Sequence, residues 1–182
     1  MKISMKLSVD SVDKAIRELR QYKKQITVNS DELSHRIAKE GAEKAAKKVR
    51  GMATYGNLND IASSIDARKK SNGHWVVATN NFKAPYVEFG TGVRGKNSPH
   101  PVAPQMGWTY MTGQFTYHDG KLGWWYPTTS DDPNTTLRQT ENGDWIAFTS
   151  GMPSRPFMHE TAIELKSSVR STAREVFKND KR

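Results

Sequence analysis

The sequence predicts an α+β protein whose helices are segregated from small antiparallel sheets. Apolar residues recur at helical spacing in residues 10–50 and again in residues 158–176. Between these stretches, runs rich in β-branched and aromatic residues are separated by turn dipeptides. The resulting order of strand, helix, helix, strands and helix is typical of helices that pack beside an antiparallel sheet.

The N-terminal part predicts a strand and two helices. Residues 2–9 alternate in polarity, as a short strand does. A first helix is expected to begin at Asp10 or Ser11, where the carboxylate of Asp10 would cap free amides. The same chemistry recurs at residues 29–32, which predict the start of a second helix. The apolar faces of the two helices are Val12, Ile16, Leu19 and Tyr22 or Lys23, and then Leu33, Ile37, Gly41, Ala45 and Val49. Gly41 and Ala45 would allow another element to approach closely.

Residues 58–79 predict a short helix followed by extended chain. Leu58, Ile61 and Ile65 have helical spacing. The turn dipeptide Asn72-Gly73 precedes a β-rich run at residues 75–79, so we expect either a hairpin or a helix-to-strand corner.

Residues 93–150 have a different composition and are predicted to form an insertion. They contain four of the five tryptophans, and three closely spaced prolines exclude regular structure around residues 99–104. Two hairpins are expected, one turning at Asp119-Gly120 and one at Asn142-Gly143 in a type I′ turn. Residues 145–149 are apolar on both faces, which predicts a strand that is buried on two sides or lies at an interface.

The chain is predicted to close with an amphipathic helix, which Pro156 can precede because the first-turn amide has no helical partner. We therefore expect one domain over residues 1–182, with residues 93–150 inserted in it. The inner face of the last helix is predicted to be Met158, Ala162, Leu165, Val169, Ala173 and Val176.

The charge distribution leaves two interpretations open. The net charge is +9, and residues 1–50 hold 13 Lys or Arg against 7 Asp or Glu, a net charge of +6. This basic stretch is interpreted mainly as a solvated helix face that carries Lys39, Lys44, Lys47, Lys48 and Arg50. The alternative is a DNA-binding module formed by the helices within residues 14–50.

Composition excludes several other classes. Apolar residues make up 35% of the chain, so the core should be modest and partner subunits are expected to complete it. Without cysteine, disulfides and thiolate metal sites are excluded. The first six residues lack the apolar core of a signal peptide, and no run of 18 apolar residues could span a membrane.

The sequence carries no recognisable catalytic motif. The five histidines show neither the helical spacing nor the cysteine neighbours of a metal site. Residues 90–95 lack the Lys-Ser/Thr of a phosphate-binding loop, and Asp131-Asp132 before Pro133 is typical of a solvated turn. We expect no enzyme, including no wall hydrolase, and no cofactor.

Three short motifs occur in order and resemble a known family. Residues 84–92 read Ala-Pro-Tyr-Val-Glu-Phe-Gly-Thr-Gly, and residues 152–158 contain a Pro-Phe pair that opens the last helix. Gly56-Asn57-Leu58 followed by Ser64-Ile65 is the third motif. Together they resemble the small tail-completion or head–tail joining proteins of long-tailed bacteriophages. The signature residues are Tyr86, Glu88, Phe89, Gly90, Thr91, Gly92, Pro153, Arg155, Pro156 and Phe157.

The resemblance implies a structural virion protein at the neck or tail top, made in the host bacterial cytoplasm. It implies self-association into a ring, often a hexamer, that assembles on a partner and contacts the head connector and the tail tube or its terminator. DNA contact is not favoured, and no membrane is expected. The aromatic residues of the insertion resemble forms from phages of Gram-positive hosts; these are Trp108, Tyr110, Trp124, Trp125 and Tyr126.

The signature also has a physical interpretation. Glu88 lies between apolar neighbours, so a buried Glu88 needs a partner, and Arg155 is the natural candidate for an ion pair. Gly90 and Gly92 would supply a tight reversal into the insertion. The rings of Tyr86, Phe89 and Phe157 are expected to seal the core between the sheet and the last helix.

Overall fold

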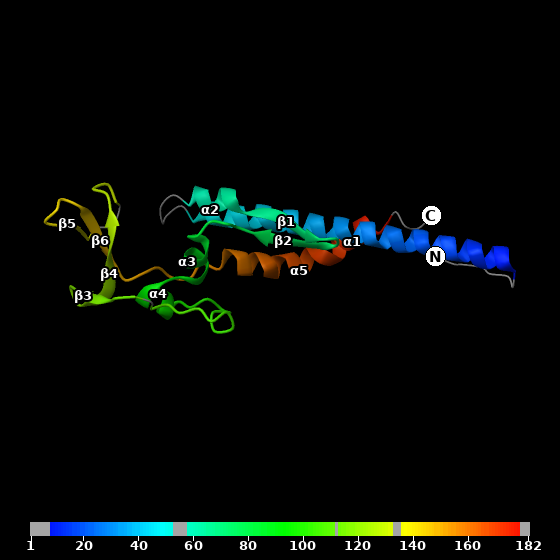
Figure 1. The fold of residues 1–182 in the computed structure, drawn as a ribbon. Coiled ribbons are helices and arrows are strands. Elements are labelled where there is room, and N and C mark those ends of the chain that lie inside the picture. Colours follow the sequence, from blue (N-terminus) through cyan, green and yellow to red (C-terminus); the bar gives the residue numbers. More distant parts are fainter. Residues whose placement is uncertain (1–7, 53–57, 112, 133–135, 179–182) are drawn as a thin grey trace. The chain divides into compact units, whose positions relative to one another are not determined.

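The computed structural model describes residues 8–52, 58–111, 113–132 and 136–178, and it confirms the α+β class. The chain has two compact units (Figure 1). The first comprises residues 1–81 and 158–182, and the second comprises residues 82–157. The predicted insertion, residues 93–150, falls inside the second unit. A single domain over residues 1–182 stays a prediction.

The first unit is built on one long helix, α1 (Val9–Gly51). Its N-cap is Ser8, whose hydroxyl accepts from the Ser11 amide, so Asp10 lies in the first turn and is not the cap. Residues 2–7 of the expected strand lie outside the described residues, and Val9 is already helical.

The predicted helix boundary at residues 29–32 is wrong, because α1 continues through it. Asn29 is buried and accepts from Gln25 Nε2 at 2.8 Å, one turn earlier in the same helix. Asp31 accepts from groups of a neighbouring hairpin and caps no helix. Asn and Asp often start helices because their side chains bond to nearby backbone groups in place of the helical bonds. Here both side chains bond to other partners, so the helix continues.

Next to α1 lie the short helix α2 (Asn59–Ser64) and an antiparallel hairpin of β1 (Asp66–Ser71) and β2 (His74–Ala78). This confirms the short helix and decides for the hairpin over the corner. Gly73 in its turn has a φ of 73°. The hairpin tip is fixed to α1, since the Ser34 hydroxyl donates to the Gly73 carbonyl at 2.8 Å and the His35 ring lies 4.3 Å from that of Trp75. Gly56 and Asn57 lie outside the described residues.

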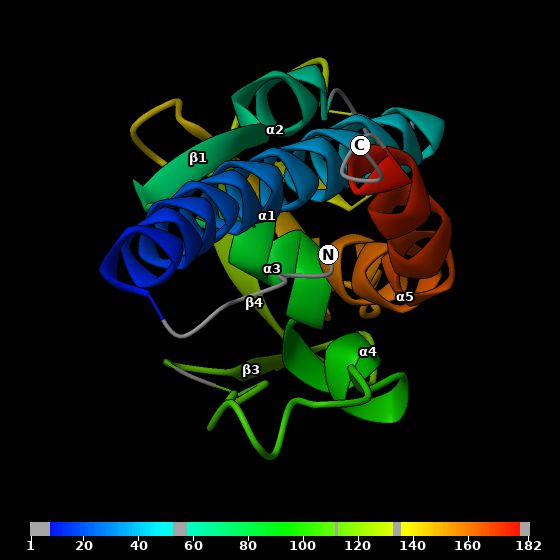
Figure 2. The ribbon, with the colours of Figure 1, turned by 90° about the vertical axis from the view of Figure 1, so that its right-hand side faces the viewer.

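The last helix, α5 (Phe157–Val176), lies beside α1 (Figure 2). The small residues of α1 permit this packing: a Cβ added to Gly41 would lie 2.8 Å from side-chain atoms of both Leu165 and Val77. Ala38, Ala42, Ala45, Ala46 and Val49 of α1 are buried with it. The close approach predicted for Gly41 is thus confirmed.

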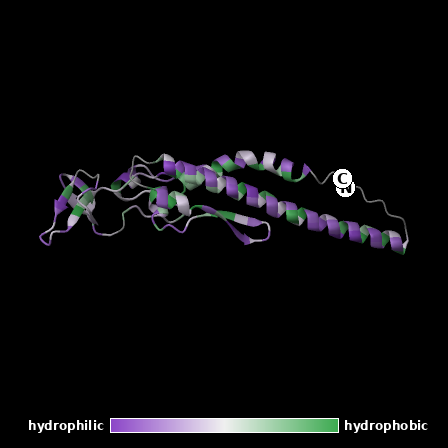
Figure 3. Ribbon diagram, turned by 90° about the horizontal axis from the view of Figure 1, so that it is seen from above, coloured by the Kyte–Doolittle hydropathy of each residue, from purple (hydrophilic) through white to green (hydrophobic). Residues whose placement is uncertain are grey.

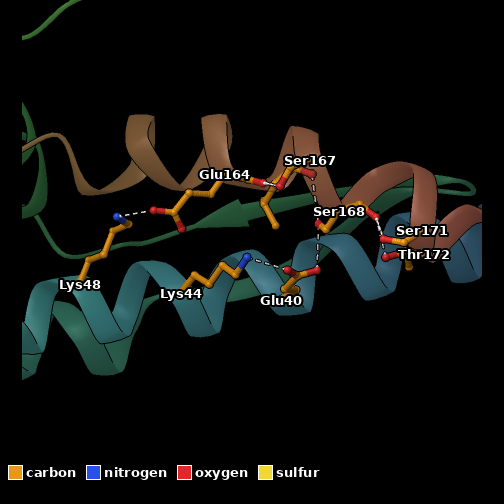
Figure 4. Close-up of polar contacts among 9 residues, drawn as sticks. Glu40, Lys44, Lys48, Glu164, Ser167, Ser168, Ser171 and Thr172 are labelled. Atoms are coloured by element: carbon orange, nitrogen blue, oxygen red, sulfur yellow. Dashed lines mark hydrogen bonds and ion pairs between the residues drawn. The ribbon is translucent and has the colours of Figure 1, made fainter.

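The predicted inner face of α5 is partly wrong. Ala162 and Val169 are exposed, while Thr161 is buried and is 2% exposed. The Ser168 hydroxyl donates to Glu40 of α1 at 3.2 Å, so polar side chains help form the buried side of α5 (Figure 4). Hydrophobicity alone therefore predicts an inner face of α5 that differs from the buried one.

Lys48 shows that the basic face of α1 is not simply solvated. Its ammonium lies 2.8 Å from a carboxylate oxygen of Glu164 on α5 (Figure 4). A carboxylate oxygen of Glu160, also on α5, lies 3.0 Å from the same ammonium. The hydrogen bond to Glu164, then that to Glu160, raises the pKa of Lys48. Lys44 pairs with Glu40 at 2.8 Å. Lys48 therefore pairs with α5, and Lys44 pairs within α1.

Asp31 is expected to make the first unit sensitive to acid. The hydrogen bond from Lys69 (2.8 Å), then that from the Gly73 amide (2.9 Å), lowers its pKa from 3.8 to about 2, and the Trp75 indole also donates. A depressed pKa means stability that is present above pH 4 and is lost as pH falls through about 2. Asp31→Asn should therefore lower the denaturant midpoint at neutral pH, and the difference from wild type should shrink over that acid range.

The second unit contains α3 (Ala84–Phe89), α4 (Gly92–Asn97) and an antiparallel sheet in the order β3-β4-β6-β5. The strands are β3 (Thr116–His118), β4 (Lys121–Thr128), β5 (Leu137–Gln139) and β6 (Trp145–Thr149). Both predicted hairpins are present. In β6 the adjacent residues Ala147 and Phe148, which face opposite sides, are both buried, as its two apolar faces predicted.

The type I′ turn predicted at Asn142-Gly143 is wrong. Among the described residues Asp119 is the one non-glycine with positive φ, so Asn142 does not adopt it, while Gly143 has a φ of 88°. The Gly143 amide donates to the Thr140 carbonyl at 3.0 Å, and the Thr140 amide donates to the Asp144 carbonyl at 2.8 Å. These bonds fit a tight turn whose last residue, a left-handed glycine, forms a bulge.

Candidate functional site

The residues of the sequence signature form one connected structure in the second unit. Residues 86–92 run alongside residues 150–157, and backbone hydrogen bonds join the two segments. We call these two segments the clasp. Backbone hydrogen bonds therefore hold the first signature segment against the second.

The centre of the clasp is a pair of reciprocal backbone bonds. The Thr91 amide donates to the Met152 carbonyl at 2.9 Å, and the Met152 amide donates back to the Thr91 carbonyl at 3.1 Å. The Arg94 amide adds a bond to the Ser150 carbonyl at 3.2 Å. The two segments, which lie some sixty residues apart in the sequence, are thereby held in fixed register.

Glycines make this approach sterically possible. Gly90, Gly92 and Gly151 have φ values of 78°, 63° and 91°. A Cβ at Gly90 would lie 2.5 Å from the Ser154 amide nitrogen, and one at Gly151 would lie 2.0 Å from the Thr91 carbonyl oxygen. Because these atoms are backbone, a side chain at either position cannot be accommodated by a rotamer change.

The second segment also caps α3. The Arg155 amide donates to the carbonyls of Val87 (3.0 Å) and Glu88 (3.2 Å), and the Ser154 hydroxyl donates to the Glu88 carbonyl at 2.9 Å. These carbonyls lie at the C-terminal end of a short helix, where intrahelical donors are lacking. Pro153 and Pro156 flank the capping residues, and Phe157, which is 1% exposed, follows.

Glu88 is buried, as its apolar neighbours indicated, and one partner is a histidine that the sequence did not reveal. Glu88 is 7% exposed and His100 2% exposed, with Glu88 Oε1 3.0 Å from His100 Nε2. The Val102 amide donates to His100 Nδ1 at 3.2 Å, so a neutral His100 carries its proton on Nε2 and donates it to Glu88. The ion pair of Glu88 with Arg155 stays a prediction.

Aromatic rings complete the clasp. Phe89 lies between two partners, with centroids 4.3 Å from His100 and 4.9 Å from Trp108. The Trp108 indole donates to the Gly90 carbonyl at 3.0 Å, and the Tyr110 hydroxyl accepts from the His100 amide at 2.8 Å. The prediction that Tyr86 seals the core is wrong, since Tyr86 is 48% exposed and its ring meets Trp108 edge-on.

The remaining aromatic residues of the predicted insertion lie on the sheet. Trp125 contacts the rings of His118 and Phe148, and the Arg138 guanidinium lies 4.7 Å above it. Trp124 contacts Phe115 on the other face of β4, since adjacent residues of a strand point to opposite sides. Tyr126 donates to Asp132 at 3.1 Å, which places Asp132 among turn hydrogen bonds rather than in an acid–base pair.

The described residues show no arrangement for metal chemistry: no group of three or more His, Cys, Asp or Glu side chains is placed to hold an ion. Within the same residues, no helix is both long and apolar enough to cross a bilayer. The second unit also exposes large apolar side chains, among them Phe82, Tyr86 and Met106.

Comparison with known proteins supplies the class. Residues 13–90 match the model of the family described as "Bacteriophage HK97-gp10, putative tail-component". This segment is similar to the HK97-gp10-like family. The match runs from α1 to Gly90 of the clasp and confirms the family resemblance drawn from the motifs. No curated protein and no solved structure matches the chain.

The match indicates a coarse function. A family described as a phage tail component suggests a structural tail protein and implies a place in the virion. The second segment of the clasp, at residues 150–157, lies beyond the matched region. The evidence that this segment belongs with the first one is therefore the hydrogen bonds described above and not the family match.

Proposed function

We propose that the protein acts at the neck or tail top of a long-tailed phage, where it joins the head connector to the tail. The observation that carries this proposal is the family match over residues 13–90. The clasp supports it as well, because a preorganised rigid element suits a protein that works by docking.

The joining mechanism in this proposal is interface burial. Copies of the chain associate into a ring, a hexamer in the proposed form, that assembles fully only on its partner. One side contacts the head connector and the other contacts the tail tube or terminator. Such contacts would cover exposed apolar side chains of the second unit, which include Phe82, Tyr86, Met106 and Tyr117. The protein is made in the host cytoplasm and acts without catalysis.

DNA binding by residues 14–50 is the second candidate, favoured by the exposure of Lys14, Arg17, Arg20, Lys23 and Lys24. Lys44 and Lys48 count against it, since both are engaged in ion pairs. Each phosphate contact releases counterions, so DNA affinity would fall steeply with salt in a gel-shift titration. Absence of duplex binding near physiological salt removes this candidate.

Deletion of the gene tests the joining role. We expect a deletion lysate to contain filled heads and finished tails that are separate, and plasmid-borne wild-type protein should restore whole particles. Infectious virions of normal appearance without the gene would overturn the proposal. Heads with no tails at all would indicate a role in tail assembly instead.

A further inference from the structure

The N-terminal half of α1 carries apolar side chains that the protein does not bury. Val9, Ile16 and Leu19 are 78%, 40% and 53% exposed, and Val12 and Ile26 are 38% exposed each. In Figure 1 this half extends past the ends of the β1–β2 hairpin and of α5, elements of the same unit. Figure 3 shows green hydrophobic positions recurring among purple ones along it.

These exposed residues have the spacing of a coiled coil. Five of the seven exposed large apolar residues of this half fall at alternating intervals of three and four, with Lys23 at the one intervening position; they are Val9, Val12, Ile16, Leu19 and Ile26. The other two, Tyr22 and Val28, lie off this series. A period of 3.5 residues keeps one seam of a helix facing a partner helix over successive turns. We call these six positions the seam. A helix that merely faces water has no need of this regularity.

The charges beside the seam select the partner and its direction. The acidic residues Asp10 and Asp13 lie at the start of the segment, and Arg20, Lys23 and Lys24 lie near its end. A second copy that runs parallel and in register would place Lys23 against Lys23 in the seam. An antiparallel copy with Ile16 opposite Leu19 would place Asp13 of each chain beside Arg20 of the other.

We propose that two copies of this chain pair through an antiparallel coiled coil formed by residues 9–26 of α1. The contact is isologous, so each copy contributes the same seam and every charge pair occurs twice. It is independent of the ring and of the neck location, since it follows from the seam and its charges alone. The contact spans about five helical turns, which places it among small interfaces with weak, concentration-dependent association.

Charge exchange tests the pairing. By sedimentation velocity of the full chain over a concentration series, wild type should form a dimer. Asp13→Arg or Arg20→Glu alone should weaken it by at least about ten-fold, because like charges then meet twice. The double variant D13R/R20E should restore it. Weak association of the double variant, or unchanged association of both single variants, overturns the proposal, provided that far-UV circular dichroism shows equal helicity.

Apolar substitution supplies a matched control. Leu19→Glu places a charge in the seam, while Val28→Glu makes the same change at a residue that is equally 53% exposed but lies off the seam. We expect L19E to be monomeric and V28E to dimerise like wild type. A ring contact elsewhere on the molecule would survive L19E, so failure of the pair and failure of the proposed neck function are separable.

Cross-linking fixes the direction. The chain has no cysteine, so single-cysteine variants report one contact each. Ile16→Cys mixed with a size-tagged Leu19→Cys protein should give a disulfide-linked heterodimer under mild oxidation. Neither variant alone should cross-link efficiently, because in the antiparallel pair residue 16 does not face residue 16 of the other copy, and residue 19 does not face residue 19. Efficient self-cross-linking of each single variant would show a parallel pair and contradict the proposal.

Discussion

Gly151→Ala should be among the most damaging single substitutions in the second unit. Its φ of 91° is disfavoured for a residue with a side chain, and the added Cβ would lie 2.0 Å from the Thr91 carbonyl oxygen and 2.5 Å from the carbonyl carbon. Relief requires the two clasp segments to separate, with loss of the reciprocal Thr91–Met152 bonds. We expect the free energy of unfolding to fall by at least about 3 kcal/mol.

Gly143→Ala is the matched control for this effect. Its φ of 88° is nearly the same, but the nearest atom to an added Cβ is Gln139 Nε2 at 3.7 Å. The backbone strain alone should cost about 1–2 kcal/mol. Trp108, Trp124, Trp125 and Trp145 lie in the second unit, so tryptophan fluorescence in a denaturant titration reports its unfolding. Equal losses for the two variants would show that close packing of the clasp contributes nothing.

His100→Ala is expected to destabilise the second unit by about 3 kcal/mol, because it removes a buried ring and a hydrogen-bond donor from a buried carboxylate. The ring also contacts Phe89, so a packing loss contributes. The same fluorescence titration measures the total. A loss below about 1 kcal/mol, the size of an ordinary surface effect, would contradict the role assigned to His100.

A double-substitution cycle separates the charge from the packing. Glu88→Gln keeps the shape of the side chain and removes its charge. If the buried carboxylate accounts for much of the loss, the double variant E88Q/H100A should be more stable than the sum of the single effects predicts. Strict additivity would assign the whole effect of His100→Ala to packing.

Local patterns in the sequence predicted most elements, and the error at the boundary in α1 has a physical cause. The Asn72-Gly73 and Asp119-Gly120 turns, the buried strand at residues 145–149 and the final helix were predicted because their signals are short-range. The boundary at Asn29 was wrong because the partners of Asn29 and Asp31 decide their role, and those of Asp31 lie about forty residues away. Tertiary contacts of this kind leave no local pattern.

The clasp shows the same limit at the candidate site. A lone acid between Val87 and Phe89 predicted a buried carboxylate, and Glu88 is buried. Its partner His100 lies in a Pro-rich stretch with no helical or strand period, so spacing could not point to it. Trp108 and Tyr110 were assigned to the insertion, yet the Trp108 indole donates to the Gly90 carbonyl and the Tyr110 carbonyl accepts from the Gly92 amide, both in the clasp. The signature therefore marks a structural junction more extensive than its own residues.

The proposed location of this protein is the joint between head and tail. Gold-labelled antibody against the native protein, applied to intact virions purified away from free tails, tests it most directly. We expect label at the head–tail joint, at one place per particle, and no label on particles from a deletion strain complemented with an unrelated gene. Label along the tail shaft, at the tail tip, or nowhere on intact virions would contradict it.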